Sequence, residues 1–286
     1  MSTLLFALNM ILQQTQGMVT RRYGKRHNFG GMFFNAVICL FAMVFFMVTD
    51  TGGLMFPKEL WFYGILSSTM FATGFYAMFI AYNLGSFVLS NMISSFSGVI
   101  TILYGIIFLR EPAGFTTYTG IVLVFLSVAL MQYRKSEGGD KKGFSFAWLV
   151  SALASAVSNG FIGIIQKEQQ LRFSGAYDNE FMIISLGGAF LLLLVIVLFK
   201  EREALKASIL PATLYGVVAG ALNGAMNLVN LALISIMNLS VFTPMKTGVS
   251  FLLSFFISVV IYRERFTKLQ LVSAGMGIVA LIMFAL

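Results

Sequence analysis

Long apolar runs separated by short polar stretches make up almost the whole sequence. Each run is close to the roughly 20 mostly apolar residues that an α-helix needs to cross a bilayer. We interpret the runs as ten membrane-spanning helices at residues 2–20, 28–49, 60–83, 86–109, 114–133, 145–166, 179–200, 209–235, 238–262 and 267–286. The pattern therefore predicts an all-α membrane protein.

The composition excludes a soluble fold. Hydrophobic residues make up 58% of the 286 residues and charged residues only 10%, with a mean hydropathy of +0.89. A soluble protein carries about a quarter charged residues, and this chain has too few to cover a water-facing surface. The first run lacks a basic segment before it and contains glutamines, so we expect a retained helix and not a cleaved signal peptide.

The longest hydrophilic stretch divides the chain into two sets of five runs. We predict a first five-helix repeat at residues 1–135, a hydrophilic linker at 136–143 and a second five-helix repeat at 144–286. An odd number of helices per repeat inverts the second copy in the membrane. The expected fold is therefore ten transmembrane helices arranged as two inverted five-helix repeats, with a site near the midplane where the halves meet.

Short motifs recur in the two halves. Arg110-Glu111 aligns with Arg263-Glu264 at an offset of 153, and each pair ends a long run. Gln16-Gly17 aligns with Asn159-Gly160 at an offset of 143. The identities are few, so chance similarity stays open beside a true repeat. We interpret Glu111 and Glu264 as structural residues that cap helices or pair with basic residues.

The net charge of +8 bears on orientation, because the basic residues lie between the apolar runs. The odd-numbered loops hold fourteen Lys and Arg residues, and the even-numbered loops hold four: Lys58, Arg110, Lys167 and Arg172. The protein is then expected in the cell membrane, either plasma or inner. The positive-inside rule places the odd loops on its cytoplasmic side and both termini on its outer side. We therefore expect the lipid bilayer, and not a nucleic acid, as the partner of these basic residues.

Several short motifs carry a resemblance to a known family. They are Tyr76–Tyr82, Phe108–Pro112 followed by Gly120, Thr243-Pro244 and Tyr262–Phe266. With the helix count, they resemble the ten-helix EamA-type form of the drug/metabolite transporter (DMT) superfamily. The chain departs from the family at Asn91, where a proline is usual, and at Gln13–Gly17, where Trp-Gly is common. The resemblance implies transport of small metabolites, and relatives generally have cytoplasmic termini, against the charge count.

Lys246 is the sharpest candidate for substrate binding. It lies within an apolar run, where a charged side chain costs at least about 2.5–3.5 kcal/mol and normally faces a cavity or a partner. It also follows Pro244, which cannot donate its backbone hydrogen bond. Two interpretations stay open: a site for an anionic or acceptor-rich group, or a side chain that snorkels to the membrane surface.

Polar residues at helical spacing form three further stripes. They are Asn9, Gln13 and Gln16; Ser151, Ser155, Ser158 and Asn159; and Asn223, Asn227 and Asn230. If the halves are related, the first two stripes face each other across a cavity, although packing between helices is the plain alternative. Gly216, Gly220 and Gly224 recur every four residues and predict close helix packing.

The predicted substrate-binding set joins these features. Tyr76 belongs to it as a ring that could stack on a substrate. The set is Lys246, Asn223, Asn227, Gln13, Gln16, Asn159, Tyr76 and Asn91.

Acidic, histidine and cysteine residues narrow the mechanism. All eleven acidic residues lie at run ends or in loops, so we expect no buried carboxylate for ion coupling. The chain has one histidine and one cysteine, which are too few for a typical metal site or catalytic set. We therefore expect no enzyme activity, no bound metal and no cofactor. The expected protein is a monomeric secondary transporter that works by alternating access, through facilitated diffusion or exchange. Its expected substrate is a small zwitterionic, neutral or anionic metabolite, amino-acid-like or similar. The alternatives are a drug or amine exporter of the same fold, a non-saturating channel or a scaffold subunit.

Overall fold

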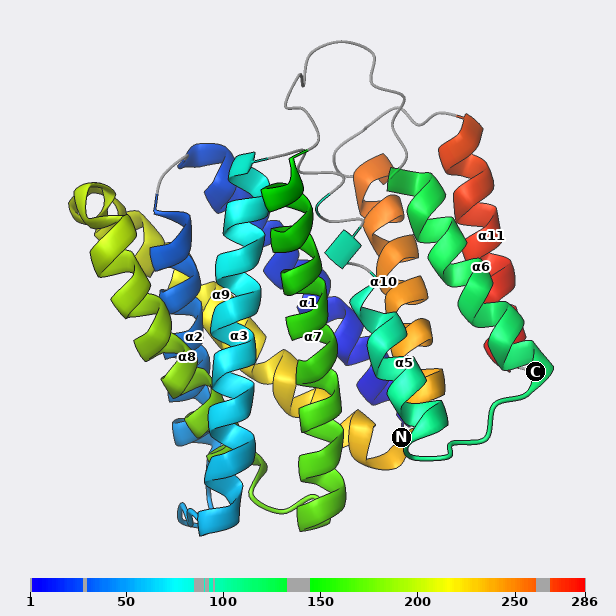
Figure 1. Cartoon of the computed structure of the whole chain (residues 1–286), viewed down its shortest axis with the longest axis horizontal. Coiled ribbons are helices and arrows are strands. Elements are labelled where there is room, and N and C mark those ends of the chain that lie inside the picture. The colour runs from blue at the N-terminus through cyan, green and yellow to red at the C-terminus, as the bar shows by residue number, and fades with distance from the viewer. Residues whose placement is uncertain are drawn as a thin grey trace. The chain divides into compact units, whose positions relative to one another are not determined.

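The computed structural model describes residues 2–27, 30–84, 90, 93–94, 96–132, 145–260 and 268–285 (Figure 1). All regular structure in these ranges is helical. The helices are α1 (Ser2–Arg26), α2 (Gly31–Thr49), α3 (Lys58–Leu84), α5 (Ser97–Ile107), α6 (Phe115–Gln132), α7 (Phe146–Phe173), α8 (Asp178–Lys200), α9 (Arg202–Ile236), α10 (Leu239–Val260) and α11 (Lys268–Ala285). The all-α prediction is confirmed, and each predicted run overlaps at least one of these described helices. The predicted linker lies outside the described residues.

Five helices in the described ranges are long and apolar enough to cross a membrane: α2, α3, α7, α8 and α9. Shorter apolar segments occur in α5, α6 and α11. Where the helices outrun the predicted spans, most of the extra residues are polar. The helix α1 continues to Arg26, α7 continues to Phe173, and α9 begins at Arg202. A helical backbone needs no apolar side chains once it leaves the bilayer, so hydropathy alone underestimates these lengths.

The described helices form two compact units, which do not follow the predicted halves of the sequence. The first unit comprises Met1–Phe79 and Phe161–Ile236, and the second comprises Ile80–Gly160 and Met237–Leu286. Each unit therefore combines helices from both halves. The helix α7 begins in the second unit and ends in the first.

In the first unit, α2 packs against both α8 and α9, and α1 lies along α9 (Figure 1). The fully buried Phe46 and Phe181 belong to its apolar core. The small-residue face of α9 lies on α2, because a Cβ atom added to Gly220 would fall 2.6 Å from the Phe41 Cβ and 2.9 Å from the Ile38 carbonyl oxygen. Gly216 and Gly224 meet α2 in the same way, which confirms the predicted packing role of this glycine spacing.

In the second unit, α5 packs against α10, and α6 packs against α11. The α6–α11 contact contains a reciprocal pair of hydrogen bonds. The Ser127 hydroxyl donates to the Ser273 carbonyl and the Ser273 hydroxyl donates to the Ser127 carbonyl, each at 2.6 Å. The pairs α2–α8, α5–α10 and α6–α11 each join helices of the same rank in the two sets of five. Related repeats would make such pairs, and the inversion itself stays a prediction.

Glu111 links two helices of the second unit. Arg110, three residues beyond the end of α5, lies in the left-handed region (φ 53°), and the Glu111 amide donates back to the Gly105 carbonyl at 3.1 Å. The Glu111 carboxylate then accepts bonds from the Leu239 and Ser240 amides, both at 2.8 Å, at the start of α10. The capping role predicted for Glu111 is confirmed, and Glu264 lies outside the described residues.

Candidate functional site

The polar stripe of α1 lies against the polar stripe of α9 within the first unit. The Asn9 amide nitrogen donates to the Met226 carbonyl at 3.0 Å, and the Asn223 amide nitrogen donates to the Gln16 Oε1 atom at 3.3 Å. We call Asn9, Gln13, Gln16, Asn223 and Asn227 the α1–α9 seam. Four of the eight predicted substrate-binding residues therefore lie along one pair of helices.

The asparagines of α9 do not all serve the seam. The Asn227 amide nitrogen donates to both the side-chain and the backbone oxygen of Asn223, each at 2.9 Å. Asn230 turns instead toward α7, where its amide nitrogen donates to the Gln166 Oε1 atom at 3.0 Å. The first two amides thus belong to the seam, whereas the third joins two helices.

Two buried oxygen atoms of the seam have no hydrogen-bond partner among the described residues: Asn9 Oδ1 and Gln13 Oε1. The orientation of the Asn9 amide follows from its nitrogen, which already donates to a carbonyl. A buried acceptor left unpaired costs about 1–3 kcal/mol, and native proteins usually satisfy such atoms with water or a ligand. The seam is therefore suited to a group that donates hydrogen bonds, such as an ammonium or a hydroxyl.

Lys246 and Asn159 belong to the second unit. The Lys246 ammonium lies 5.7 Å from the centre of the Phe242 ring, one turn earlier on α10, and the side chain is half-buried. That distance suits a cation–π contact. It fits a site residue and a snorkelling residue equally, so both interpretations of Lys246 stay open. Asn159 is exposed, and its amide nitrogen donates to the Ser155 carbonyl at 2.9 Å within α7.

The other two predicted site residues are not part of the seam. Tyr76 is half-buried and packs against the apolar core of the first unit. Asn91 lies outside the described residues. The second stripe, from Ser151 to Asn159, belongs to the second unit. Within the first unit, α9 is a partner of the polar face of α1.

Sequence reasoning missed the buried polar end of α7. Gln166, Lys167, Gln169 and Gln170 are all less than 9% exposed. The Lys167 ammonium donates to the Ile234 carbonyl at 2.8 Å, in the last turn of α9, so the prediction that Lys167 lies in a loop is wrong. The amide and lysine side chains continue the helical spacing of α7 beyond its apolar run. This pattern could have predicted the longer helix.

The expectation of no buried carboxylate is also wrong. Glu180, in the first turn of α8, is 6% exposed, and its Oε1 atom accepts a hydrogen bond from the Met55 amide at 2.9 Å. Glu201 accepts bonds from the Met32 and Phe33 amides at the start of α2, at 3.3 and 3.2 Å. Both carboxylates satisfy backbone donors at helix or loop ends, so their contacts are structural.

Comparisons with known proteins agree with this architecture. The EamA-like transporter family matches residues 1–133. A protein of known crystal structure is similar over 99% of this chain and 95% of its own, with a TM-score of 0.78 and 14% sequence identity. At that identity the likeness shows the fold alone. No curated protein matches the sequence.

Proposed function

We propose that this chain, a multi-pass membrane protein of the EamA-like family in the drug/metabolite transporter superfamily, moves a small organic metabolite across the membrane by alternating access. Members of the family are transporters. The polar side chains of the seam support this activity, because an apolar helix pair that only packs needs no unpaired amide oxygens.

The single observation that carries the substrate class is the pair of unpaired acceptors, Asn9 Oδ1 and Gln13 Oε1. A substrate with an ammonium or hydroxyl group would satisfy both atoms. The neighbouring Asn223 and Gln16 amides offer further donors and acceptors. We therefore propose a zwitterionic or neutral, amino-acid-like substrate. The same acceptors also favour the second candidate, an amine exporter, because a simple amine supplies the donors without a carboxylate.

No seam residue is acidic, so we propose facilitated diffusion or exchange as the transport mode, by a monomer. For the orientation, we propose that the odd loops lie on the cytoplasmic side of the plasma or inner membrane and that both termini lie on its outer side. Basic side chains at one end of the first unit support this choice: Arg21, Arg22, Arg26, Lys200, Arg202 and Lys206. Two contacts bring these segments together, since Arg26 donates to the Tyr215 hydroxyl at 3.1 Å and Glu201 caps α2. Because Lys167 lies on α7 and not in an even-numbered loop, the excess of basic residues in the odd-numbered loops is larger than the sequence count gave.

Thermal unfolding of the purified protein against a panel of amino acids, nucleosides, phosphorylated sugars and amines tests the substrate class. We expect an amino acid to raise the Tm of the parent protein, because saturation at 100 times the Kd stabilises a protein by about 2.7 kcal/mol. In Gln13→Met we expect the ligand response to vanish. The unliganded variant should nevertheless be as stable as the parent or more so, because the change removes an unpaired buried acceptor.

Ser185→Ala is the matched control. In the described part of the chain, Ser185 also has a buried oxygen with no hydrogen-bond partner, but it lies on α8, which contributes no residue to the seam. This variant should keep the full ligand response. Equal responses in Gln13→Met and Ser185→Ala would exclude the seam as the binding site. The same titration on Lys246→Ala decides between the two interpretations of Lys246, since only a site residue changes the ligand response.

A further inference from the structure

The first turns of α9 lie across the start of α2 in the first unit. Glu201, the residue before α9, accepts hydrogen bonds from two amides in the first turn of α2. Ser208 meets the same end of α2, because a Cβ atom added to Gly30 would overlap its side chain. Further on, Gly216 lies against Val37, so the later turns of α9 run along the side of α2. A straight helix would carry Glu201 far beyond the end of α2, so α9 bends between these two parts.

The length of α9 also places its first turns outside the membrane core. Its 35 residues measure about 52 Å at 1.5 Å per residue, whereas the hydrocarbon core is roughly 30 Å thick. Pro211 lies inside the helix, where it removes a backbone hydrogen bond and favours a kink. The residues after Pro211 are enough to cross the bilayer by themselves. Residues 202–210, which we call the surface segment of α9, therefore lie at the membrane surface.

The surface segment has one face toward the protein and one face away from it. Leu205 packs against the apolar core of the first unit, and Ser208 is fully buried. Arg202 and Lys206 are exposed and lie four residues apart, so they are neighbours on the outer face. A helix of this kind at a bilayer surface places its basic side chains among the lipid headgroups.

An apolar ridge continues from the two basic side chains along α9. Leu210, Leu214 and Val217 follow Lys206 at spacings of four and three residues, and they are 69, 63 and 40% exposed. On a membrane-spanning helix, exposed apolar side chains face the acyl chains of lipids. The order along this face of α9 is thus cation first and apolar surface second. An anionic phospholipid has the matching order, with a phosphate followed by its acyl chains.

The charge at this part of the molecule is also positive. Lys200, Arg202 and Lys206 outnumber the two acidic residues among them, Glu201 and Glu203. The Glu201 carboxylate faces the amides of α2, which leaves Glu203 as the exposed acidic side chain of the surface segment. Clusters of basic residues beside a membrane-spanning helix attract anionic lipids.

We propose that the surface segment of α9 binds the headgroup of an anionic phospholipid. The lipid phosphate lies between the Arg202 guanidinium and the Lys206 ammonium, and one acyl chain lies along the ridge that begins at Leu210. This site is separate from the α1–α9 seam and does not depend on the transported substrate. The alternative role of the two basic side chains is orientation in the membrane alone, which requires positive charge but no particular lipid.

Native mass spectrometry of the full chain in detergent tests the site with two lipids that share the same acyl chains, dioleoylphosphatidylglycerol and dioleoylphosphatidylcholine. We expect the parent protein to prefer the anionic lipid. Each basic residue near the surface contributes about fivefold to such binding, so Arg202→Gln/Lys206→Gln should weaken phosphatidylglycerol by about 25-fold and leave phosphatidylcholine unchanged. Glu203→Gln should strengthen phosphatidylglycerol binding, because it removes a negative charge from the segment.

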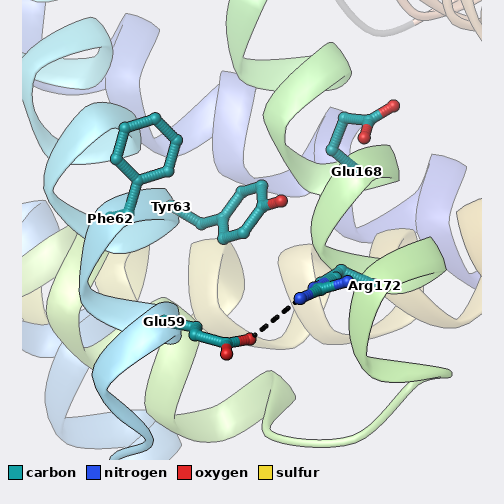
Figure 2. A pocket seen from close by; sticks show the side chains of 5 residues that line it. All are labelled: Glu59, Phe62, Tyr63, Glu168 and Arg172. Atoms are coloured by element: carbon teal, nitrogen blue, oxygen red, sulfur yellow. Dashed lines mark hydrogen bonds and ion pairs between the residues drawn. The ribbon is translucent and has the colours of Figure 1, made fainter.

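The matched control is Lys58→Gln/Arg172→Gln, which removes the same charge from the other end of the first unit. The helix α2 starts at the basic end, so α3, which follows the end of α2, begins with Lys58 at the opposite end. Arg172 lies there too, 3.3 Å from the Glu59 carboxylate of α3 (Figure 2). This control should keep the full preference for phosphatidylglycerol.

Equal loss of the preference in the two double variants would show that net charge, and not the surface segment, selects the lipid, and would overturn the proposal. So would a parent protein that binds the two lipids equally. Glycerol 3-phosphate, which has the phosphate without the acyl chains, separates a lipid site from a site for free phosphate. Failure of this compound to displace phosphatidylglycerol supports the lipid site, whereas displacement at concentrations similar to those of the lipid would contradict it.

Discussion

Gly220→Leu is expected to destabilise the protein strongly, because α9 packs directly on α2 at this glycine. Even the first added carbon would lie 2.6 Å from the Phe41 Cβ, 2.9 Å from the Ile38 carbonyl oxygen and 3.2 Å from the Ala42 amide nitrogen. Two of these three atoms belong to the α2 backbone, which cannot turn aside as a side chain can. Overpacking of this kind costs about 1–3 kcal/mol and sometimes more, so we expect a loss near 3 kcal/mol.

Thermal unfolding in detergent, followed by near-UV circular dichroism, measures this loss. Gly275→Leu is the control, because a Cβ placed at Gly275 on α11 has no described atom within 4 Å beyond the neighbouring residues and backbone of its own helix. There the substitution should cost nothing and could add up to about 1 kcal/mol of helix propensity. If the two variants unfold at the same temperature, the close approach of α9 to α2 is wrong.

Glu111→Ala is expected to have the next largest effect. The substitution removes a carboxylate that accepts two backbone hydrogen bonds of 2.8 Å at the start of α10. Loss of a helix cap costs about 0.5–2 kcal/mol, and hydrogen bonds to a charged group are worth about 1.5–3 kcal/mol each. We therefore expect a loss of about 2 kcal/mol or more, with the start of α10 opening first.

Hydrogen exchange of the residues 239–242 amides, measured together with the Tm, locates that effect. Glu203→Ala serves as the comparison, since Glu203 lies exposed in the first turn of α9. It should leave both the Tm and the exchange at α10 unchanged. Similar exchange at residues 239–242 in parent and Glu111→Ala would show that the carboxylate is not the cap.

The helices could be predicted from the sequence because each membrane span is an apolar run, and every described helix falls within or around one. Their polar extensions could not, since hydropathy stops at Gln166 while the α7 backbone continues to Phe173. That error also hid the partner of Asn230, because Gln166 lies at the boundary. It placed Lys167 in a loop when its ammonium binds the Ile234 carbonyl.

The site could be predicted only in part, for a similar reason. Periodicity shows which face of a helix is polar, so the stripes of Gln13, Gln16, Asn223 and Asn227 were predictable. It does not show which helix covers that face, and the Asn223–Gln16 bond joins residues 207 positions apart. The capping role of Glu111 was likewise predictable from its place at a run end, whereas its partner, 128 residues later, was not.

Solute counterflow in proteoliposomes tests the central claim, that this chain transports an amino-acid-like metabolite by alternating access. The vesicles hold an unlabelled amino acid identified by the stability panel, and uptake of the labelled form is measured against its outside concentration. We predict saturable uptake that the internal amino acid stimulates, lost in Gln13→Met and retained in Ser185→Ala. Uptake that rises linearly with concentration and ignores the internal amino acid would contradict alternating access, and would favour a channel.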